Sequence, residues 1–301
     1  MDSLPETIEQ LSGKSSFVIY MDPDSSRSQI SYIDLQYLID KGLQIMNHGS
    51  ETPILQRNRL RKLLLGRRRE KQGEVQIVRR IGKKEAIEFW ERDFFAVAKW
   101  LTYFEDFQQL PERMKILLLK SIWHVWTRLE KLAITAASRR ENDCKDGEIM
   151  LETNEAYDTK SVEMDISWFT KFPKEKLKFL FDEPHEWMDL SVIQLLVDLQ
   201  PTDIELTYML CQLCFEYAGK RHQGEVQDVT ERFQEVLAND LHDYYTNMDM
   251  PRYSFRLSQM MKINKMIQED IRRKRVNLEL AKIFPVYCVK FSHPEMFEDL
   301  A

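Results

Sequence analysis

The stretch WLTYFEDFQQLPERMKILLLKSIWHVW, residues 100–126, decides the fold. Its second half carries apolar residues on more than one face of a helix: Ile116, Leu117, Leu118, Leu119, Ile122, Trp123, Val125 and Trp126. A helix that is apolar nearly all round must be surrounded by protein. A two-layer bundle leaves each helix one wet face, so we expect the helix at Lys115–Ala137 to lie in the middle of three layers.

Composition supports a mainly helical chain. The 301 residues are 43% hydrophobic and include only 9 Gly and 10 Pro, which favours long helices over short strands joined by tight turns. We therefore predict an all-α fold. A net charge of −6 argues against a chain that wraps nucleic acid along its whole length. Four scattered cysteines suit a reducing compartment and predict buried free thiols.

Apolar spacing and breaker residues place the helices along the chain. Thr202 and Glu205 form a capping box at the start of one of them. Residues 138–167 are polar and acidic, with Ile149–Leu151 predicted as a small strand pair or a loop. The predicted helices are Tyr32–Met46, Arg57–Lys71, Trp90–Phe104, Lys115–Ala137, Trp187–Leu199, Thr202–Tyr217, Gly224–Tyr245, Leu257–Ile283 and Pro294–Leu300.

The sequence predicts two regions that differ in how well they are ordered. Residues 1–31 are polar and are predicted to form a loosely ordered lead-in, whereas residues 32–301 are predicted to form one irregular helical domain. The acidic start lacks the basic and apolar segments of a secretory signal, and no apolar run reaches the roughly 20 residues that span a bilayer. We expect a soluble intracellular protein that does not enter a membrane.

One ungapped pattern within residues 100–126 resembles the signature of nuclear hormone receptor ligand-binding domains, and its Trp-rich helix is similar to the receptors that expanded in nematodes. Weaker likeness covers residues 32–301, where 201–205 resembles the start of helix 8, 252–253 helix 10, and 294–300 the activation helix. The resemblance implies an antiparallel three-layer helical sandwich. The pattern is Trp100, Phe107, Leu110, Lys115, Leu118, Leu119, Lys120 and Trp123.

In this family a groove between helix 3, helix 4 and the activation helix accepts a leucine-rich coregulator helix. Apolar anchors fill such a groove, and opposite charges grip the two ends of the bound helix dipole. The resemblance assigns the floor to Ala98 and Ile116 and the acidic grip to Asp299. The full predicted coregulator groove is Ala98, Thr102, Lys115, Ile116, Lys120, Met296, Phe297 and Asp299.

The resemblance also implies a ligand pocket beneath helices 3 and 5. No cofactor is expected beyond a small lipophilic ligand of unknown identity. Ile134 stands where some family members hold an arginine for an acidic ligand, so a carboxylate held at that point is not expected. Plain core packing is the competing interpretation of the aromatic positions. The predicted pocket positions are Phe89, Trp90, Asp93, Trp123 and Thr127.

The sequence departs from the family pattern at the clamp. Thr102 stands where a lysine is expected at the end of helix 3, and the nearest positive charge is Lys99. Asp299 replaces the usual glutamate. The primary hypothesis is a ligand-responsive transcriptional regulator in the nucleus, with the cytoplasm possible, that binds coregulators or pairs with itself or another receptor. The alternative is a ligand-independent helical interaction scaffold, or a dominant-negative partner of other receptors.

The family's zinc-bearing DNA-binding half needs eight cysteines, whereas this chain offers only the pair Cys211 and Cys214. Their spacing on a predicted buried helix favours core thiols over a zinc half-site. That zinc domain is therefore expected to be lost or to lie outside this product. No direct DNA binding is expected from this chain.

Two rival functions remain weaker. A helical enzyme lacks support, because the sequence holds no Gly-rich phosphate loop, no His-Glu-x-x-His zinc motif and no aspartate-rich magnesium site. The basic runs at 57–71 and 272–275 suit contact with phosphates or nuclear import. Solvated arginines on an exposed amphipathic helix explain them equally well.

Overall fold

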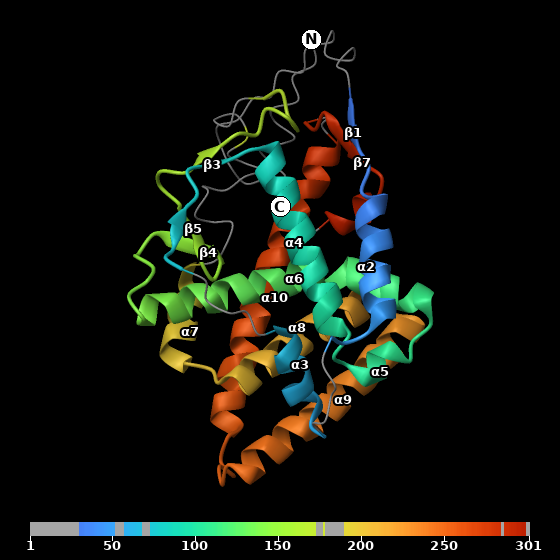
Figure 1. The fold of residues 1–301 in the computed structure, drawn as a ribbon, viewed down its shortest axis with the longest axis vertical. Helices are drawn as coiled ribbons and strands as arrows, with labels where there is room; N and C mark the ends of the chain where they lie inside the picture. Colours follow the sequence, from blue (N-terminus) through green and yellow to red (C-terminus); the bar gives the residue numbers. More distant parts are fainter. Residues whose placement is uncertain are drawn as a thin grey trace.

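The computed structural model describes residues 30–51, 57–67, 73–172, 177, 190–283 and 286–298. These residues form a largely helical molecule with three small sheets (Figure 1). In chain order the elements are β1 (Ser31–Ile33), α2 (Gln36–His48), α3 (Arg59–Arg67), β2 (Gln76–Ile77), β3 (Arg80–Ile81), α4 (Lys83–Leu101), α5 (Glu105–Gln108), α6 (Glu112–Arg140), β4 (Glu148–Glu152), β5 (Glu155–Asp158), β6 (Glu163–Met164), α7 (Leu190–Leu199), α8 (Asp203–His222), α9 (Gly224–Asn247), α10 (Ser254–Ile283), β7 (Val289–Phe291) and the 3-10 turn η4 (Pro294–Met296).

Helix α6 lies at the centre of the fold, as its all-round apolar sequence predicts. It packs against α4, α7, α8 and β4, and Figure 1 shows it crossing the middle of the molecule. Every residue from Ser121 to Thr127 is buried, and seven consecutive residues cover all faces of a helix. The architecture agrees with the antiparallel helical sandwich expected from the resemblance.

The small sheets connect distant parts of the chain. Strands β4 and β5 form an antiparallel hairpin, which confirms the strand pair predicted around Ile149–Leu151. Strand β1 pairs in parallel with β7, so that Ser31 lies opposite Val289 and Ile33 opposite Phe291. The β1–β7 pairing ties the beginning of the described chain to its last described segment.

Several predicted helix ends shift: α4 runs from Lys83 to Leu101, and α8 continues to His222. Two predictions near the ends of the described chain are wrong. The helix predicted from Tyr32 begins at Gln36, because Tyr32 lies in β1 and pairs with Lys290. The helix predicted at Pro294–Leu300 is a single 3-10 turn through Met296, and residues 299–301 lie outside the described part. Pairing of β1 with β7 and ion pairs from η4 override the local helical preference at both places.

Three cations of the basic run at 57–71 are paired with acids in the structure, whereas Arg57 and Arg61 are exposed. Helix α3 buries Leu60, Leu63 and Leu64, and its cations reach acids on four other elements. The partners are far away in sequence, so a local charge count does not reveal them. The ion pairs are Arg59 with Asp106 and Asp240, Lys62 with Glu105, and Arg67 with Glu130 and Asp203.

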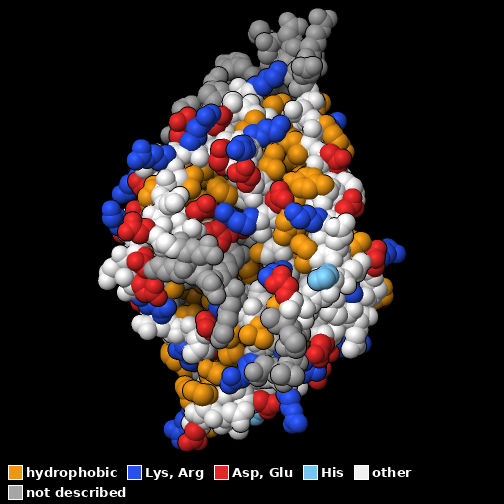
Figure 2. All heavy atoms as spheres, in the orientation of Figure 1, with side chains coloured by type: hydrophobic (Ala, Val, Ile, Leu, Met, Phe, Trp, Pro, Cys, Tyr) orange, Lys and Arg blue, Asp and Glu red, His pale blue; other side chains and the backbone are white. Residues whose placement is uncertain are grey.

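The surface carries both signs of charge. Figure 2 shows Lys and Arg side chains interspersed with Asp and Glu over one face of the molecule. A continuous basic field, which nucleic-acid binding requires, is not visible on that face. Among the described helices, none is long and apolar enough to cross a membrane.

The second basic run, 272–275, is also drawn into the fold. Asp270 is buried on α10 and forms ion pairs with Arg128 of α6 at 2.7 Å and with Lys274 at 3.2 Å. The Lys274 side chain is only 7% exposed. Burial, reinforced by the nearby Arg128, lowers the pKa of Lys274 to about 8. The expected solvated face is therefore wrong at this position.

Replacing Lys274 with methionine is expected to raise the free energy of unfolding at pH 7 by about 1–3 kcal/mol, because a charged amine is costly to bury and Asp270 keeps Arg128 as its partner. The wild-type lysine has a lower pKa in the folded state than in the unfolded state. The loss of stability that comes from burying the charged lysine is therefore full below pH 8, and it disappears as pH rises towards 10.5. Urea unfolding at pH 7 and pH 9.5 should show a difference that shrinks at the higher pH; a constant difference would contradict this account.

Candidate functional site

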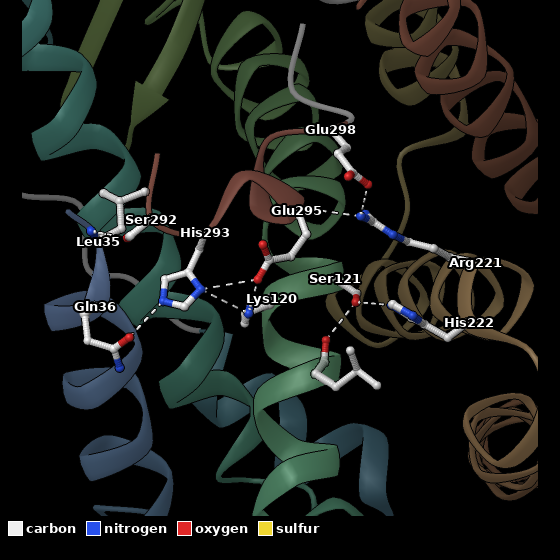
Figure 3. A network of polar contacts seen from close by, with 11 residues as sticks. Leu35, Gln36, Lys120, Ser121, Arg221, His222, Ser292, His293, Glu295 and Glu298 are labelled. Carbon is white, nitrogen blue, oxygen red and sulfur yellow. Dashed lines mark hydrogen bonds and ion pairs between the residues drawn. The ribbon is translucent and has the colours of Figure 1, made fainter. Parts of the chain in front are cut away.

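The last described residues, Val289–Glu298, form what we call the C-terminal segment. Polar contacts fasten it to helices α2, α6 and α8 (Figure 3). Its backbone pairing with β1 continues at Leu35, whose N–H donates to Oγ of Ser292 at 2.8 Å. The segment that resembles an activation helix is therefore anchored on three sides.

Lys120 of α6 is the central cation of these contacts. Its ammonium forms an ion pair with Glu295, and His293 lies 3.4 Å away. The other ring nitrogen of His293 lies 2.9 Å from Oε1 of Gln36, at the start of α2. Burial raises the pKa of Glu295, but the bond and charge of Lys120, a backbone hydrogen bond and the contact with His293 together outweigh burial and leave the pKa lowered. Glu295 is thus ionised at neutral pH and the pair persists.

A second anchor joins the segment to the end of α8. Arg221 donates to the Glu298 carboxylate at 2.7 Å and to the backbone oxygen of Glu295 at 2.9 Å. The next residue on α8, His222, lies 2.6 Å from the hydroxyl of Ser121 on α6. The first half of α6, the end of α8 and the C-terminal segment therefore meet at one place.

Aromatic packing holds the inner face of the C-terminal segment. Met296 is buried, and the Phe297 ring stacks on Phe291 with centroids 4.4 Å apart. Phe297 also lies 4.7 Å from Trp90 of α4 and 6.0 Å from Trp123 of α6. Two predicted pocket positions, Trp90 and Trp123, thus meet through a residue predicted for the groove.

The remaining pocket positions have different surroundings. Asp93 forms a buried ion pair with Lys131 at 2.6 Å, and the Phe89 ring lies beneath the guanidinium of Arg92. Thr127 lies one turn after Trp123 on α6 and is buried. Within the residues that the structure describes, neither the Thr127 hydroxyl nor the Trp123 indole N–H has a hydrogen-bond partner. Buried polar atoms of this kind normally find one.

The groove positions lie on α4 and α6. Ala98 is fully buried, Ile116 and Lys115 are half-buried, and the Thr102 hydroxyl donates to the backbone oxygen of Lys99. The cation nearest the expected clamp, Lys99, instead forms an ion pair with Glu51 at 2.7 Å. The predicted acidic grip, Asp299, lies outside the described residues.

Sequence reasoning missed the position of α2. This helix packs on α4, and its Gly42 approaches both walls of the groove: a Cβ there would lie 2.8 Å from Cε1 of Phe94 and 3.2 Å from Cδ2 of Leu119. Lys41 lies over the Phe95 ring at 4.5 Å. The available signal was a run of buried positions with spacing i, i+3, i+4 and i+7, which is typical of a helix bound in a groove. Leu35, Leu38 and Ile39 are apolar anchors, and Gly42 allows a close approach.

All four cysteines are free thiols; three are buried as predicted, whereas Cys288 is half-buried. Cys211 and Cys214 are fully buried in α8, and burial raises the pKa of each thiol well above its usual value. No group of three or more His, Cys, Asp or Glu side chains suited to a metal ion occurs in the described ranges. Both thiols therefore belong to the core.

Comparison with known proteins decides the family. Residues 71–284 match the family described as the ligand-binding domain of nuclear hormone receptor. The chain belongs to the nuclear hormone receptors. It is 56% identical to nuclear hormone receptor family member nhr-130 of Caenorhabditis elegans, covering 99% of this chain and 70% of that protein. It is 45% identical to nhr-55 of the same organism, covering 99% and 72%.

Membership fixes the class of function. Nuclear hormone receptors regulate transcription, so this receptor domain is part of a transcription regulator and not an enzyme. The family match covers the helices from α4 to α10 that build the sandwich. Helix α2 and the C-terminal segment, which meet where Gln36 contacts His293, both lie outside the matched residues.

Proposed function

We propose that this receptor domain regulates transcription by docking a leucine-rich coregulator helix in the predicted groove, under the control of a small lipophilic ligand bound below it. The observation that carries the proposal is the position of Phe297, which contacts Trp90 and Trp123 while its neighbour Glu295 holds Lys120. A change in packing at the pocket positions would therefore alter the positions of the groove residues Phe297 and Lys120. Coupling of this kind lets a ligand shift the population of segment positions.

Unpaired polar atoms support the ligand half of the proposal. A buried donor without a partner costs about 1–3 kcal/mol, and a ligand acceptor beside Trp123 and Thr127 would remove that cost. Mass spectrometry of the purified domain should reveal a bound lipophilic molecule that Thr127→Trp, which adds a large side chain beside Trp123, excludes. The same molecule retained at equal amounts in Thr127→Trp would refute this site.

The coregulator half is tested by transcription from a reporter, with the chain fused to an unrelated DNA-binding domain. Ile116→Ser, on the groove floor, is expected to reduce regulation by about tenfold, since one lost apolar anchor weakens docking by roughly 1.4 kcal/mol or more. Leu117→Ser is the matched control, because Leu117 is also half-buried but points about 100° away on α6. Equal regulation by both variants would exclude the groove.

A second candidate function is a ligand-independent interaction scaffold or dominant-negative partner. One observation favours it: Trp90, Trp123 and Phe297 fill space by contacting one another, and Asp93 is already neutralised by Lys131. Dimerisation is part of both proposals, and the exposed apolar side chains Phe255 and Val276 on α10 support it. The proposed location is the nucleus.

A further inference from the structure

We propose that α2 is a built-in competitor for the coregulator groove, and that a coregulator helix has to displace it in order to bind. This inference rests on the proposed function of the groove. Its first support is the sequence of α2 itself. The run Leu35-Gln-Tyr-Leu38-Ile39 is a short leucine-rich motif, and its three apolar side chains are all buried. It offers the kind of anchors that a coregulator helix would offer.

The second support is where α2 lies. The groove walls are α4 and α6, and Gly42 approaches Phe94 on the first and Leu119 on the second. Glycine is required at this point, because any Cβ would lie too close to the Phe94 ring. Ala98, on the groove floor, follows Phe94 by one turn on α4. Helix α2 therefore covers the surface on which a partner helix would dock.

The third support is the direction of α2. A helix in this groove should place its positive N-terminal end near acidic groups and its negative C-terminal end near a cation. The N-terminal residue Gln36 contacts His293, beside Glu295 of the C-terminal segment. Beyond the other end, Glu51 pairs with Lys99 on α4. Figure 3 shows the start of α2 facing the C-terminal segment and Lys120.

Tethering explains why such a competitor would be effective. Residues 49–58 join α2 to α3, and a short tether gives a linked segment an effective concentration on the order of millimolar. A free coregulator helix must outcompete that concentration. The departures at Thr102 and Lys99 then acquire a physical meaning, since Lys99 is already engaged by the residues that follow α2.

Gly42→Leu tests the competitor. Leucine favours the helical state of α2 more than glycine does, but its side chain cannot fit between Phe94 and Leu119. In this variant α2 should remain helical but should not pack against α4 and α6. Gln44→Leu, on the exposed face of α2, is the matched control. A labelled synthetic peptide with a Leu-x-x-Leu-Leu motif should bind the full-length Gly42→Leu chain at least about tenfold more tightly than wild type or Gln44→Leu.

A second variant, Leu35→Ser with Leu38→Ser, removes two anchors without adding volume and should give the same gain if Gly42→Leu fails to fold. A labelled peptide copying residues 33–48 is the second probe, and it too should bind only the released variants. Equal affinity of the Leu-x-x-Leu-Leu peptide for all chains would overturn the competitor and leave the groove function intact. If the variants with a displaced α2 bound the 33–48 peptide but not the Leu-x-x-Leu-Leu peptide, the proposed coregulator function would be overturned instead.

Discussion

Replacing Glu205 with alanine is expected to lower the free energy of unfolding by about 3–5 kcal/mol, because the change leaves a partly buried cation without its partner. The Glu205 side chain is only 1% exposed. Its carboxylate accepts hydrogen bonds from Arg256 of α10 and Tyr245 of α9, and from the backbone of Thr202 at 2.7 Å. Arg256 also donates to the backbone oxygens of Leu199 and Gln200, so this one site ties α7, α8, α9 and α10 together.

The control is Asp203→Ala on the same helix turn. Asp203 also pairs with an arginine, Arg67, but its side chain is 66% exposed, and exposed pairs contribute only about 0–1 kcal/mol. Urea unfolding at pH 7 compares the two. A loss for Glu205→Ala no larger than that for Asp203→Ala would contradict the structural role of the pair.

Acid should reduce the effect of the Glu205 substitution. Burial raises the pKa of Glu205, but the hydrogen bonds from Arg256 and Tyr245 outweigh it and leave the pKa lowered. A lowered pKa contributes stability that is complete above the unfolded value, near 4.5, and is lost as pH falls through the folded value. The difference between wild type and Glu205→Ala should therefore persist from pH 7 to pH 5 and shrink below pH 4.

Trp100→Ala is expected to cost about 3–5 kcal/mol, the range for removing a large aromatic side chain from a packed core. The Trp100 side chain is fully buried. Its ring centroid lies 5.9 Å from Trp126 on α6 and 6.5 Å from Phe215 on α8, so the deletion leaves a cavity at the junction of three helices. Differential scanning calorimetry of the purified domain measures the loss.

Two variants calibrate that result. Trp100→Phe keeps most of the packing and should lose about half as much or less. Trp168→Ala removes the same atoms from a half-buried position beside Trp90 and should also cost less. If Trp100→Ala and Trp168→Ala lowered stability equally, burial at the α4, α6 and α8 junction would not explain the importance of Trp100.

Local sequence patterns were sufficient to predict most of the helices and the burial of the central helix α6. The capping box of Thr202 and Glu205 is present with both of its bonds, and α8 begins at Asp203 as predicted. The all-round apolar run from Ile116 predicts the burial of α6, because apolar periodicity reports on every face of a helix. The family signature at Trp100–Trp123 fixed the fold, since its spacing reflects core contacts.

Charged residues were predicted less well. Arg59, Lys62 and Arg67 look like a solvated or phosphate-binding run, yet each pairs with an acid 43 or more positions away. Lys274 has the sequence context of a surface lysine and is buried against Asp270 and Arg128. The periodicity of apolar residues identifies the polar face of a helix. It does not reveal which oppositely charged residue, distant in the chain, will pair with that face.

By itself, the sequence determined the central place of α6, because burial on every side follows from apolar spacing within one helix. The helical sandwich and the receptor family came from the resemblance of residues 100–126 to the family signature. Only the tertiary structure decided what lies at the groove. Lys120 binds Glu295, Phe297 joins Trp90 to Trp123, and α2 packs on α4 with Gly42 close to Leu119 of α6. Each of these contacts joins segments that are distant in the chain. Their partners are set by packing of the whole fold, and no local pattern specifies them.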